Sequence, residues 1–344
     1  MERKTISVLM IATIVLWSCA GGDKKKAPEK KGFPPKITGN VLETFFQDDG
    51  ALNSKGEIEV GTKLKNGSWV FYYSTKDGHK KESEGSYVKD KKNGLWIDYL
   101  PDGKKKAETT FRDDIQEGMT KTYNDDGTAD EQTFKNGVLD GPAKAYFANG
   151  KLKSTGFYAA GKKNGMWITY NENGTVSSQG AYVKEKMNGP WKLNSDDGRP
   201  YQAGNYELDK QVGMWFLYDE LGRVALKAEY AKDNIKWCWM YENGRLAGEG
   251  EIAGTMDAPK IDGKWIKYYP NGNKEVECAD KGCFMMGKKM GKVKEYYPNG
   301  NLKGIGSYLN DKLNDNWIFY KEDGKTRDEE KSGYYMMGKL KKGL

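Results

Sequence analysis

The sequence contains little of the chemistry that enzymes and metal centres use. Its 344 residues include one histidine, His79, and four cysteines. His79 follows a turn glycine and has no cysteine or second histidine at metal-ligand spacing, so we expect a solvated turn residue. A phosphate-binding loop and a nucleophile elbow are also lacking. The sequence therefore predicts a protein that is not an enzyme and that has no metal and no cofactor.

Aliphatic residues are scarce for a chain of this length. Hydrophobic residues make up 37% of the sequence, charged residues 31%, and the mean hydropathy is −0.85. Aromatic side chains are plentiful, with 22 Tyr, 11 Phe and 10 Trp beside 43 Gly. One large compact core would need more aliphatic surface, whereas a disordered chain would have few aromatics. The mixture is typical of narrow, twisted sheets with many turns.

A strong net charge is absent as well. The chain carries +7 at pH 7, and without residues 1–18, in which Glu2, Arg3 and Lys4 sum to +1, it carries 7 − 1 = +6. This slight excess favours acidic partners or anionic envelope surfaces weakly. It does not predict binding to nucleic acid, which calls for a concentrated basic patch.

The N-terminal apolar run is too short to span a bilayer. Residues 6–17 form a run of about a dozen residues, the length of a signal-peptide core. The run ends in Leu16-Trp17-Ser18-Cys19, which resembles a bacterial lipobox, where a small residue precedes the cysteine that receives lipid. The resemblance implies that residues 1–18 are a lipoprotein signal peptide and that Cys19 is the lipidation site. We therefore predict an exported protein, lipid-anchored to a membrane of the bacterial cell envelope, at the outer membrane or the cell surface.

Residues 19–36 link this predicted anchor to the rest of the chain. They are rich in lysine, proline and glycine. Such a segment cannot bury enough apolar surface to fold, and its prolines and like charges extend it. We interpret it as a tether that holds the folded body away from the membrane.

The remaining chain is built from an internal repeat of about 24 residues. The pattern Gly-x-Trp-x-x-Tyr marks the start of most units. Eleven units open, in order, at Gly67, Gly94, Gly118, Gly141, Gly165, Gly189, Gly213, Ile235, Gly263, Gly291 and Asp315. Residues 37–66 are less regular and are predicted to form a degenerate N-terminal cap, so that the array itself covers residues 67–344.

Each unit reads as two strands joined by a turn. In the first strand a tryptophan lies two residues, and a tyrosine five residues, after the opening position, as Trp96 and Tyr99 do. The turn that follows, Asp102-Gly103 in this unit, predicts a two-residue type I′ hairpin. The second strand carries an aromatic residue, here Phe111, before a looser turn rich in lysine and asparagine. The prediction is an all-β fold, an elongated antiparallel meander of about eleven hairpins in an open sheet.

Two segments carry a family resemblance. The runs from Gly165 to Gly174 (Gly-Met-Trp-Ile-Thr-Tyr-Asn-Glu-Asn-Gly) and from Tyr296 to Tyr308 resemble the bacterial MORN-variant repeat of YwqK-family proteins. The resemblance recurs in register over roughly residues 60–344. It implies an elongated open sheet and a role in protein interaction. Some members of that family are antitoxins, but the signal peptide here departs from a cytosolic antitoxin.

Three functions are consistent with this pattern. The leading hypothesis is an envelope-anchored lipoprotein that acts as a non-catalytic scaffold and binds an unidentified protein partner. The second is a lipoprotein that binds cell wall or glycan, because aromatic-glycine repeats of about 20 residues also occur in cell-wall-binding modules. The third is an immunity protein, similar to the YwqK antitoxins, that neutralises a toxin outside the cytoplasm.

The cysteines after Cys19 suggest two different environments. Cys238 follows Trp237, in the column that holds Val70 and Ile97 in other units, and is therefore expected to be a buried, inert thiol. Cys278 and Cys283 lie in a unit lengthened to 28 residues. An exported location permits a disulfide between them, which would pin this insertion locally.

Alternation along the strands divides the predicted sheet into two faces. The residue after each tryptophan shares a face with the tyrosine column, as Val70 does with Tyr72 and Ile97 with Tyr99, and we expect this apolar face to be the buried one. The opposite face would carry the tryptophans and a variable column beside them. Its candidate binding residues are Trp69, Trp96, Asp98, Trp167, Trp191, Trp215, Trp239, Trp265, Lys267, Glu295 and Trp317.

A structural role for the tryptophans competes with this hypothesis. Each ring would lie across a glycine of the next strand, such as Gly85, Gly156 or Gly180, and would fill the space that the glycine leaves. In that case the ring faces would not be available to a ligand.

Overall fold

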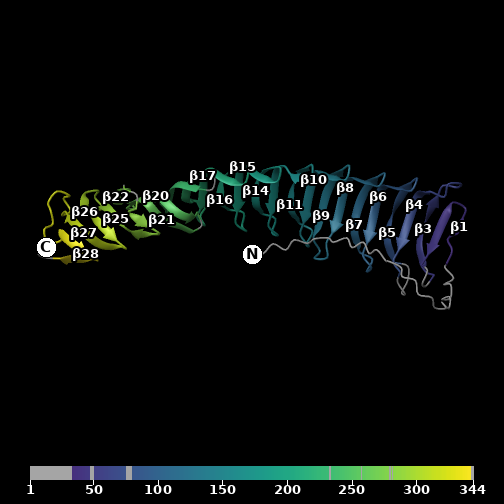
Figure 1. Ribbon diagram of the computed structural model, residues 1–344, viewed down its shortest axis with the longest axis horizontal. Helices are drawn as coiled ribbons and strands as arrows, with labels where there is room; N and C mark the ends of the chain where they lie inside the picture. The colour runs from purple at the N-terminus through teal and green to yellow at the C-terminus, as the bar shows by residue number, and fades with distance from the viewer. Residues whose placement is uncertain are drawn as a thin grey trace, which may run out of the picture.

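The computed structural model (Figure 1) describes residues 33–46, 50–74, 80–231, 234–256, 258–278, 280 and 282–341. All regular secondary structure in these residues is β-strand. The strands follow one another in chain order along a narrow, gently curved array, with the first strands at one end and the last at the other. The predicted all-β meander is therefore confirmed.

The strands are β1 (Lys36–Thr38), β2 (Val41–Phe45), β3 (Leu52–Ile58), β4 (Lys65–Tyr72), β5 (Lys81–Val88), β6 (Lys91–Tyr99), β7 (Lys105–Arg112), β8 (Ile115–Tyr123), β9 (Ala129–Lys135), β10 (Val138–Tyr146), β11 (Leu152–Ala159), β12 (Lys162–Lys163), β13 (Gly165–Tyr170), β14 (Val176–Val183), β15 (Lys186–Asn194), β16 (Pro200–Glu207), β17 (Lys210–Tyr218), β18 (Val224–Ala231), β19 (Asn234–Glu242), β20 (Arg245–Thr255), β21 (Ala258–Tyr268), β22 (Lys274–Cys278), β23 (Phe284–Met285), β24 (Lys288–Lys289), β25 (Gly291–Tyr296), β26 (Leu302–Leu309), β27 (Lys312–Phe319), β28 (Gly333–Met336) and β29 (Lys339–Lys341).

Strands pair antiparallel with their neighbours in the chain, from β1 with β2 to β28 with β29. The short β23–β24 hairpin stands aside, and β22 pairs past it with β25. Most contacts are therefore between adjacent strands, which makes the array close to one-dimensional in its energetics. The sheet is one open layer, so each of its faces must be stabilised by its own side chains.

The two edges of the sheet use different turns, and the predicted assignment was wrong. At Asp102-Gly103 only the glycine has a positive φ, of 90°, and its amide donates to the Leu100 carbonyl at 2.8 Å. This is a three-residue loop, a type I turn closed by a left-handed glycine. The tight two-residue turns lie at the opposite edge, as at Lys89-Asp90, where φ is 50° and 65°. The turns expected to be looser are thus the tight ones.

Tryptophan and glycine together form the buried part of the sheet, on the side that we call the tryptophan face. Each ring covers a glycine of the preceding strand rather than the next one. A Cβ added to Gly204, for example, would lie 2.1 Å from Cδ2 of Trp215. Seven rings are between 0% and 8% exposed: Trp69, Trp96, Trp167, Trp191, Trp215, Trp265 and Trp317.

The tryptophan column and the glycine column, which is the row of residues that the tryptophans cover on the preceding strands, vary together along the array. Tryptophan occurs where the preceding strand has glycine, and a smaller side chain occurs where it does not. The pairs, glycine column first, are Gly56/Trp69, Gly85/Trp96, Thr109/Thr120, Gln132/Ala143, Gly156/Trp167, Gly180/Trp191, Gly204/Trp215, Ala228/Cys238, Gly250/Trp265 and Gly306/Trp317. The structural role that competed with ligand binding is therefore the one that the tryptophans have.

Polar and aromatic contacts complete most of the tryptophan sites. The indole Nε1 of Trp215 donates to the Asn205 carbonyl at 3.1 Å, and Trp317 donates to Ser307 at 2.7 Å. A tyrosine of the preceding strand packs edge-on against the ring, with centroids 4.9 Å apart for Tyr206 and Trp215. The buried indole N–H is thus satisfied, and T-shaped stacking adds to the burial.

The expectation that the Ile and Tyr columns form the buried face was wrong. Val70, Ile97 and Tyr99 are only partly buried, and Ile318 remains 39% exposed. The reason is that a single-layer sheet provides nothing to cover an aliphatic side chain that stands upright from it. A tryptophan can lie along the sheet over a neighbouring glycine and so becomes buried without a second layer.

The eighth unit is shifted by one residue from the predicted register. Cys238, rather than Trp237, pairs with Ala228 and occupies the tryptophan column. Cys238 is buried, as expected, and burial raises the pKa of its thiol to about 12. Trp237 and Trp239 consequently lie on the other face, where both are partly buried.

Candidate binding surface

The burial of the tryptophans removes most of the predicted binding residues from the surface. Trp69, Trp96, Trp167, Trp191, Trp215, Trp265 and Trp317 cannot offer a ring face to a ligand, because the sheet covers one side and neighbouring side chains cover the rest. Trp239, predicted for the same face, lies on the opposite one. The predicted tryptophan surface was therefore wrong.

Two of the three charged candidates of the variable column, Lys267 and Glu295, have internal ion pairs. Glu295 is buried, with ion pairs to Lys289 at 3.2 Å and Lys303 at 3.7 Å, and it accepts a hydrogen bond from the Tyr308 hydroxyl at 2.7 Å. Lys267 pairs with Glu275 at 2.9 Å, and Asp98 is partly buried. Burial, followed by the bond to Glu295, raises the pKa of Tyr308. Glu295 is therefore a structural residue.

The other side of the sheet, which we call the methionine face, carries the residues before and after each tryptophan column position. One row of this face is a polar ladder. The Glu84 carboxylate accepts from Lys81 at 2.6 Å and from the Tyr99 hydroxyl at 2.5 Å. These bonds lower the pKa of Glu84, and the Glu84 carboxylate raises the pKa of Tyr99 to about 12. Similar carboxylate–tyrosine bonds join Glu108 to Tyr123, Glu131 to Tyr146, Glu249 to Tyr268 and Glu277 to Tyr296.

Next to this ladder an uncharged row runs across the strands of the methionine face. We call it the stripe. It has one residue on each strand from β6 to β17, the two-residue β12 excepted: Leu95, Thr110, Met119, Thr133, Pro142, Phe157, Met166, Ala181, Pro190, Asn205 and Met214. Consecutive strands lie about 4.8 Å apart, so the stripe is about 50 Å long. The stripe ends at β18, where the residue that pairs in register with Met214 is the charged Glu229.

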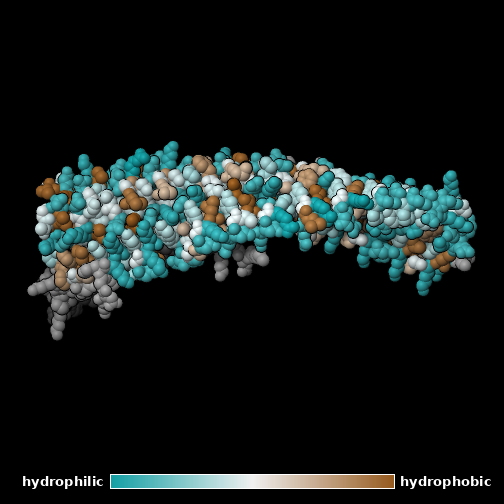
Figure 2. All heavy atoms as spheres, turned by 180° about the vertical axis from the view of Figure 1, so that it is seen from behind, coloured by the Kyte–Doolittle hydropathy of each residue, from teal (hydrophilic) through white to brown (hydrophobic). Residues whose placement is uncertain are grey.

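The large side chains of the stripe are open to solvent. Leu95, Met119 and Met166 are 52%, 58% and 56% exposed, and Phe157 is 43% exposed. Figure 2 shows one face of the array, with hydrophobic atoms gathered in patches along its length between hydrophilic ones. Exposed apolar residues scattered singly need no explanation, but a continuous uncharged row that carries several of them is a candidate interaction surface.

A shallow hollow of about 430 Å³ lies at the C-terminal end of the stripe. Its apolar rim is formed by Met166, Met214 and Phe216, and its floor by small residues that include Ala203 and Gly204. The hollow arises because Pro190 and Asn205 are short while their neighbours are long. A side chain of leucine or phenylalanine size would fill such a hollow.

The sequence did contain a signal for the stripe. The residue directly after the opening position is Ser68 in the first unit, and then Leu95, Met119, Pro142, Met166, Pro190 and Met214 in six consecutive units. It becomes Lys264, Lys292 and Asn316 in the last three units. This change from apolar to polar marks where the stripe ends.

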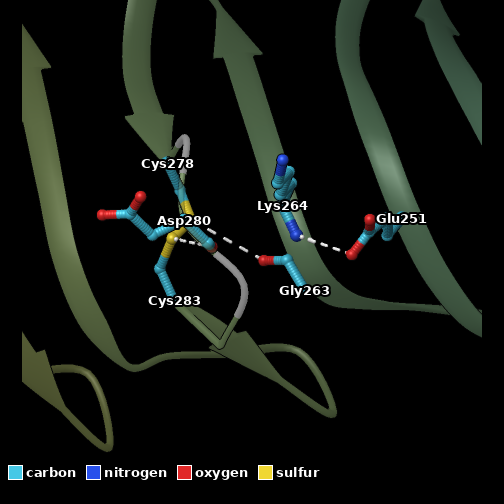
Figure 3. Close-up of a disulfide and its surroundings, with 6 residues drawn as sticks. All are labelled: Glu251, Gly263, Lys264, Cys278, Asp280 and Cys283. Carbon is cyan, nitrogen blue, oxygen red and sulfur yellow. Dashed lines mark hydrogen bonds between the residues drawn. A yellow bond between two sulfur atoms is a disulfide. The ribbon is translucent and has the colours of Figure 1, made fainter.

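Cys278 and Cys283 are joined by a disulfide, with Cα atoms 6.0 Å apart. Figure 3 shows the bond between the end of β22 and the chain before β23, beside Gly263 and Lys264 of β21. The Lys264 amide in turn donates to Glu251 of β20 at 3.2 Å. Both cysteines are buried, so the bridge ties the insertion to the packed side of the sheet.

Several predicted features lie outside the described residues. These are the signal peptide, Cys19, most of the tether and His79. Within the described residues, no helix of the length and apolarity needed to cross a membrane is found. Nor do these residues contain a group of three or more histidine, cysteine or acidic side chains placed to hold a metal ion.

The repeat is similar to a known sequence family. Residues 139–160, 261–278 and 291–310 match the MORN repeat variant. Each of these segments falls on two consecutive strands: β10 and β11, β21 and β22, or β25 and β26. No match was found among curated proteins. Among solved structures, a protein of unknown function from Bacteroides caccae is 13% identical, covering 76% of this chain and 88% of its own, with a TM-score of 0.15. A TM-score this low supports no argument about fold or function.

Proposed function

We propose that this protein is an envelope-anchored, non-catalytic module that binds another protein through its methionine face. The observation that carries the proposal is the stripe, an uncharged and exposed row about 50 Å long on the face opposite the buried rings. MORN-variant repeats in three segments are consistent with a binding module. The N-terminal lipobox resemblance supports the anchor, and the tether would leave the array free to meet a partner.

The burial of the tryptophans weakens the glycan-binding alternative. A sugar-binding platform presents an open aromatic face, whereas the seven rings of the tryptophan column are at most 8% exposed. An immunity protein would be one form of the proposed function, with a toxin as the partner. Identification of the bound protein shows whether the partner is a toxin.

Photo-crosslinking in the intact bacterium tests the proposal. A benzophenone amino acid at Met166 would sample the stripe, and the same residue at Thr169, on the same strand and the opposite face, provides the matched control. We expect a discrete protein adduct from position 166 and none from position 169. Adducts that contain only lipid or glycan, or the same adducts from both positions, would contradict the proposal.

A further inference from the structure

We propose that the stripe receives one amphipathic α-helix of the partner protein, laid across the strands, with acidic residues along the side that faces Lys192 and Lys227. This inference rests on the proposed function and specifies the chemistry of the partner. It follows from the spacing of the stripe, the shape of the hollow and the distribution of charge around both.

The spacing of the stripe fits a helix. One residue per strand gives a step of about 4.8 Å, and one turn of helix rises about 5.4 Å. Successive turns of a helix that lies perpendicular to the strands would therefore meet successive stripe residues. A helix of about 20 residues is about 30 Å long and would cover about six strands, from Phe157 on β11 to Met214 on β17.

The composition of the stripe favours a helix over an extended peptide. Methionine side chains are flexible and adapt to the apolar face of an amphipathic helix. A proline-rich extended peptide docks between aromatic walls instead, and Phe157 is the one aromatic ring of the stripe. The hollow between Met166 and Met214 gives the helix a place for one large apolar anchor.

Lysines outnumber carboxylates beside the hollow. Lys192 lines it, and on β18 Lys227 and Glu229 pair in register with Phe216 and Met214 of its rim. Among the described residues neither lysine forms an ion pair, whereas Lys81 and Lys105 of the polar ladder each pair with a glutamate at 2.6 Å. Further along the same row, Lys144 is exposed and pairs in register with Glu131 of β9, whose carboxylate already has an ion pair to Lys121 at 3.1 Å. Carboxylates of a partner would form ion pairs with Lys192 and Lys227 at the border of an apolar contact.

A second copy of the chain fits this surface poorly. Face-to-face contact centred on the hollow would bring Lys192 and Lys227 of one copy against the same lysines of the other. The like charges would repel, and the opposing carboxylates of the polar ladder already have lysine partners. An acidic helix removes this repulsion, which is why we commit to it.

Binding of designed helical peptides to the full chain tests the inference. The chain would carry Cys19→Ser, so that no attached lipid competes for the surface. The first probe is an amphipathic helix of about 20 residues with leucines on one face and glutamates at its borders. The second has the same leucines with lysine in place of glutamate, and the third probe is a phosphatidylglycerol vesicle. Fluorescence anisotropy measures peptide binding, circular dichroism follows helix formation, and sedimentation measures vesicle binding.

We expect the acidic peptide to bind at least about tenfold more tightly than the basic one, and its affinity to fall as salt is added. Replacing the rim residues, with Met166→Asn, Met214→Asn and Phe216→Asn together, should weaken binding by about 100-fold. The control, Leu95→Asn with Met119→Asn, removes exposed apolar side chains of the stripe away from the hollow and should have little effect. Lys192→Glu with Lys227→Glu should reverse the preference between the two peptides.

Four outcomes would overturn the inference. Equal binding of both peptides would remove the charge argument, and binding of vesicles but of neither peptide would assign the surface to a membrane. Self-association that the rim substitutions abolish would assign it to a second copy. If photo-crosslinking at Met166 captures a protein while the acidic peptide fails to bind, the helix is wrong and the proposed protein-binding function stands.

Discussion

Adding one methyl group to Gly204 should destabilise the middle of the array, because the ring of Trp215 occupies the space that the methyl group needs. A Cβ at this position would lie 2.1 Å from Cδ2 of the ring, far inside van der Waals contact. The ring cannot move outward freely, because Trp215 is fully buried and its Nε1 is bonded to Asn205. Overpacking of this kind costs about 1–3 kcal/mol.

The second half of the prediction is that the cost disappears when the ring is removed. Trp215→Ala alone should cost about 4 kcal/mol, since it deletes a large buried side chain. Gly204→Ala in the Trp215→Ala background should then be close to neutral, because alanine suits an extended strand better than glycine does. The coupling between the two substitutions should therefore be about as large as the cost of Gly204→Ala alone.

Hydrogen exchange is a suitable assay, because a long repeat array need not unfold in one step. The opening free energy would be measured for amides of β16 and β17, with β25–β27 as an internal reference that should not change. If Gly204→Ala costs the same with and without the Trp215 ring, the account of the tryptophan–glycine pairs is refuted.

Four other expectations follow from the same structure. The Cys238 thiol, with its pKa raised to about 12 by burial, should resist alkylation in the native protein at pH 8 and react after unfolding, and rapid native labelling would contradict its placement. Cys278→Ser with Cys283→Ser should destabilise the insertion by about 2 kcal/mol, seen as faster exchange in β22 and β25 with β6 unchanged. Wild-type protein should partition into detergent while Cys19→Ser does not, and equal partitioning would exclude the lipid anchor. Bonds from Lys81, Lys105 and Lys274 lower the pKa of Glu84, Glu108 and Glu277 below the ordinary 4.5. These carboxylates therefore stabilise the folded state above that pH, and the stability is lost as pH falls through the lowered values, so the melting temperature should drop between about pH 5 and pH 3.

The fold could be predicted from the sequence because its signals are local and repeated. The recurring Gly-x-Trp-x-x-Tyr pattern and the turn glycines specify strands and turns within about 24 residues, and nearest-neighbour pairing then defines the meander. The turn types were harder. Asp102-Gly103 and Lys89-Asp90 both make hairpins, and only the φ angles of the structure show which of them has the two-residue turn.

The buried face could not be chosen correctly from alternation alone. Period-two patterning separates Trp96 from Ile97, but it does not say which side is covered. The usual preference for aliphatic core residues favoured Ile97, whereas in a single layer the glycine opposite the ring decides the matter. The joint variation of the two columns, as in Ala228 with Cys238, was present in the sequence and identifies the tryptophan face once the strand register is known.

Methionine oxidation footprinting tests the central claim most directly, namely that the methionine face is the surface that meets a partner. Met119, Met166 and Met214 are exposed, whereas Met256 is buried and serves as the control. The protein would be oxidised briefly, both as the purified full chain and in the intact bacterial envelope, and sulfoxide would be measured at each residue by mass spectrometry. We predict fast oxidation of Met119, Met166 and Met214 in the purified chain, clear protection of Met166 and Met214 in the envelope, and slow oxidation of Met256 in both. Equal oxidation of Met166 and Met214 in both settings would contradict the claim.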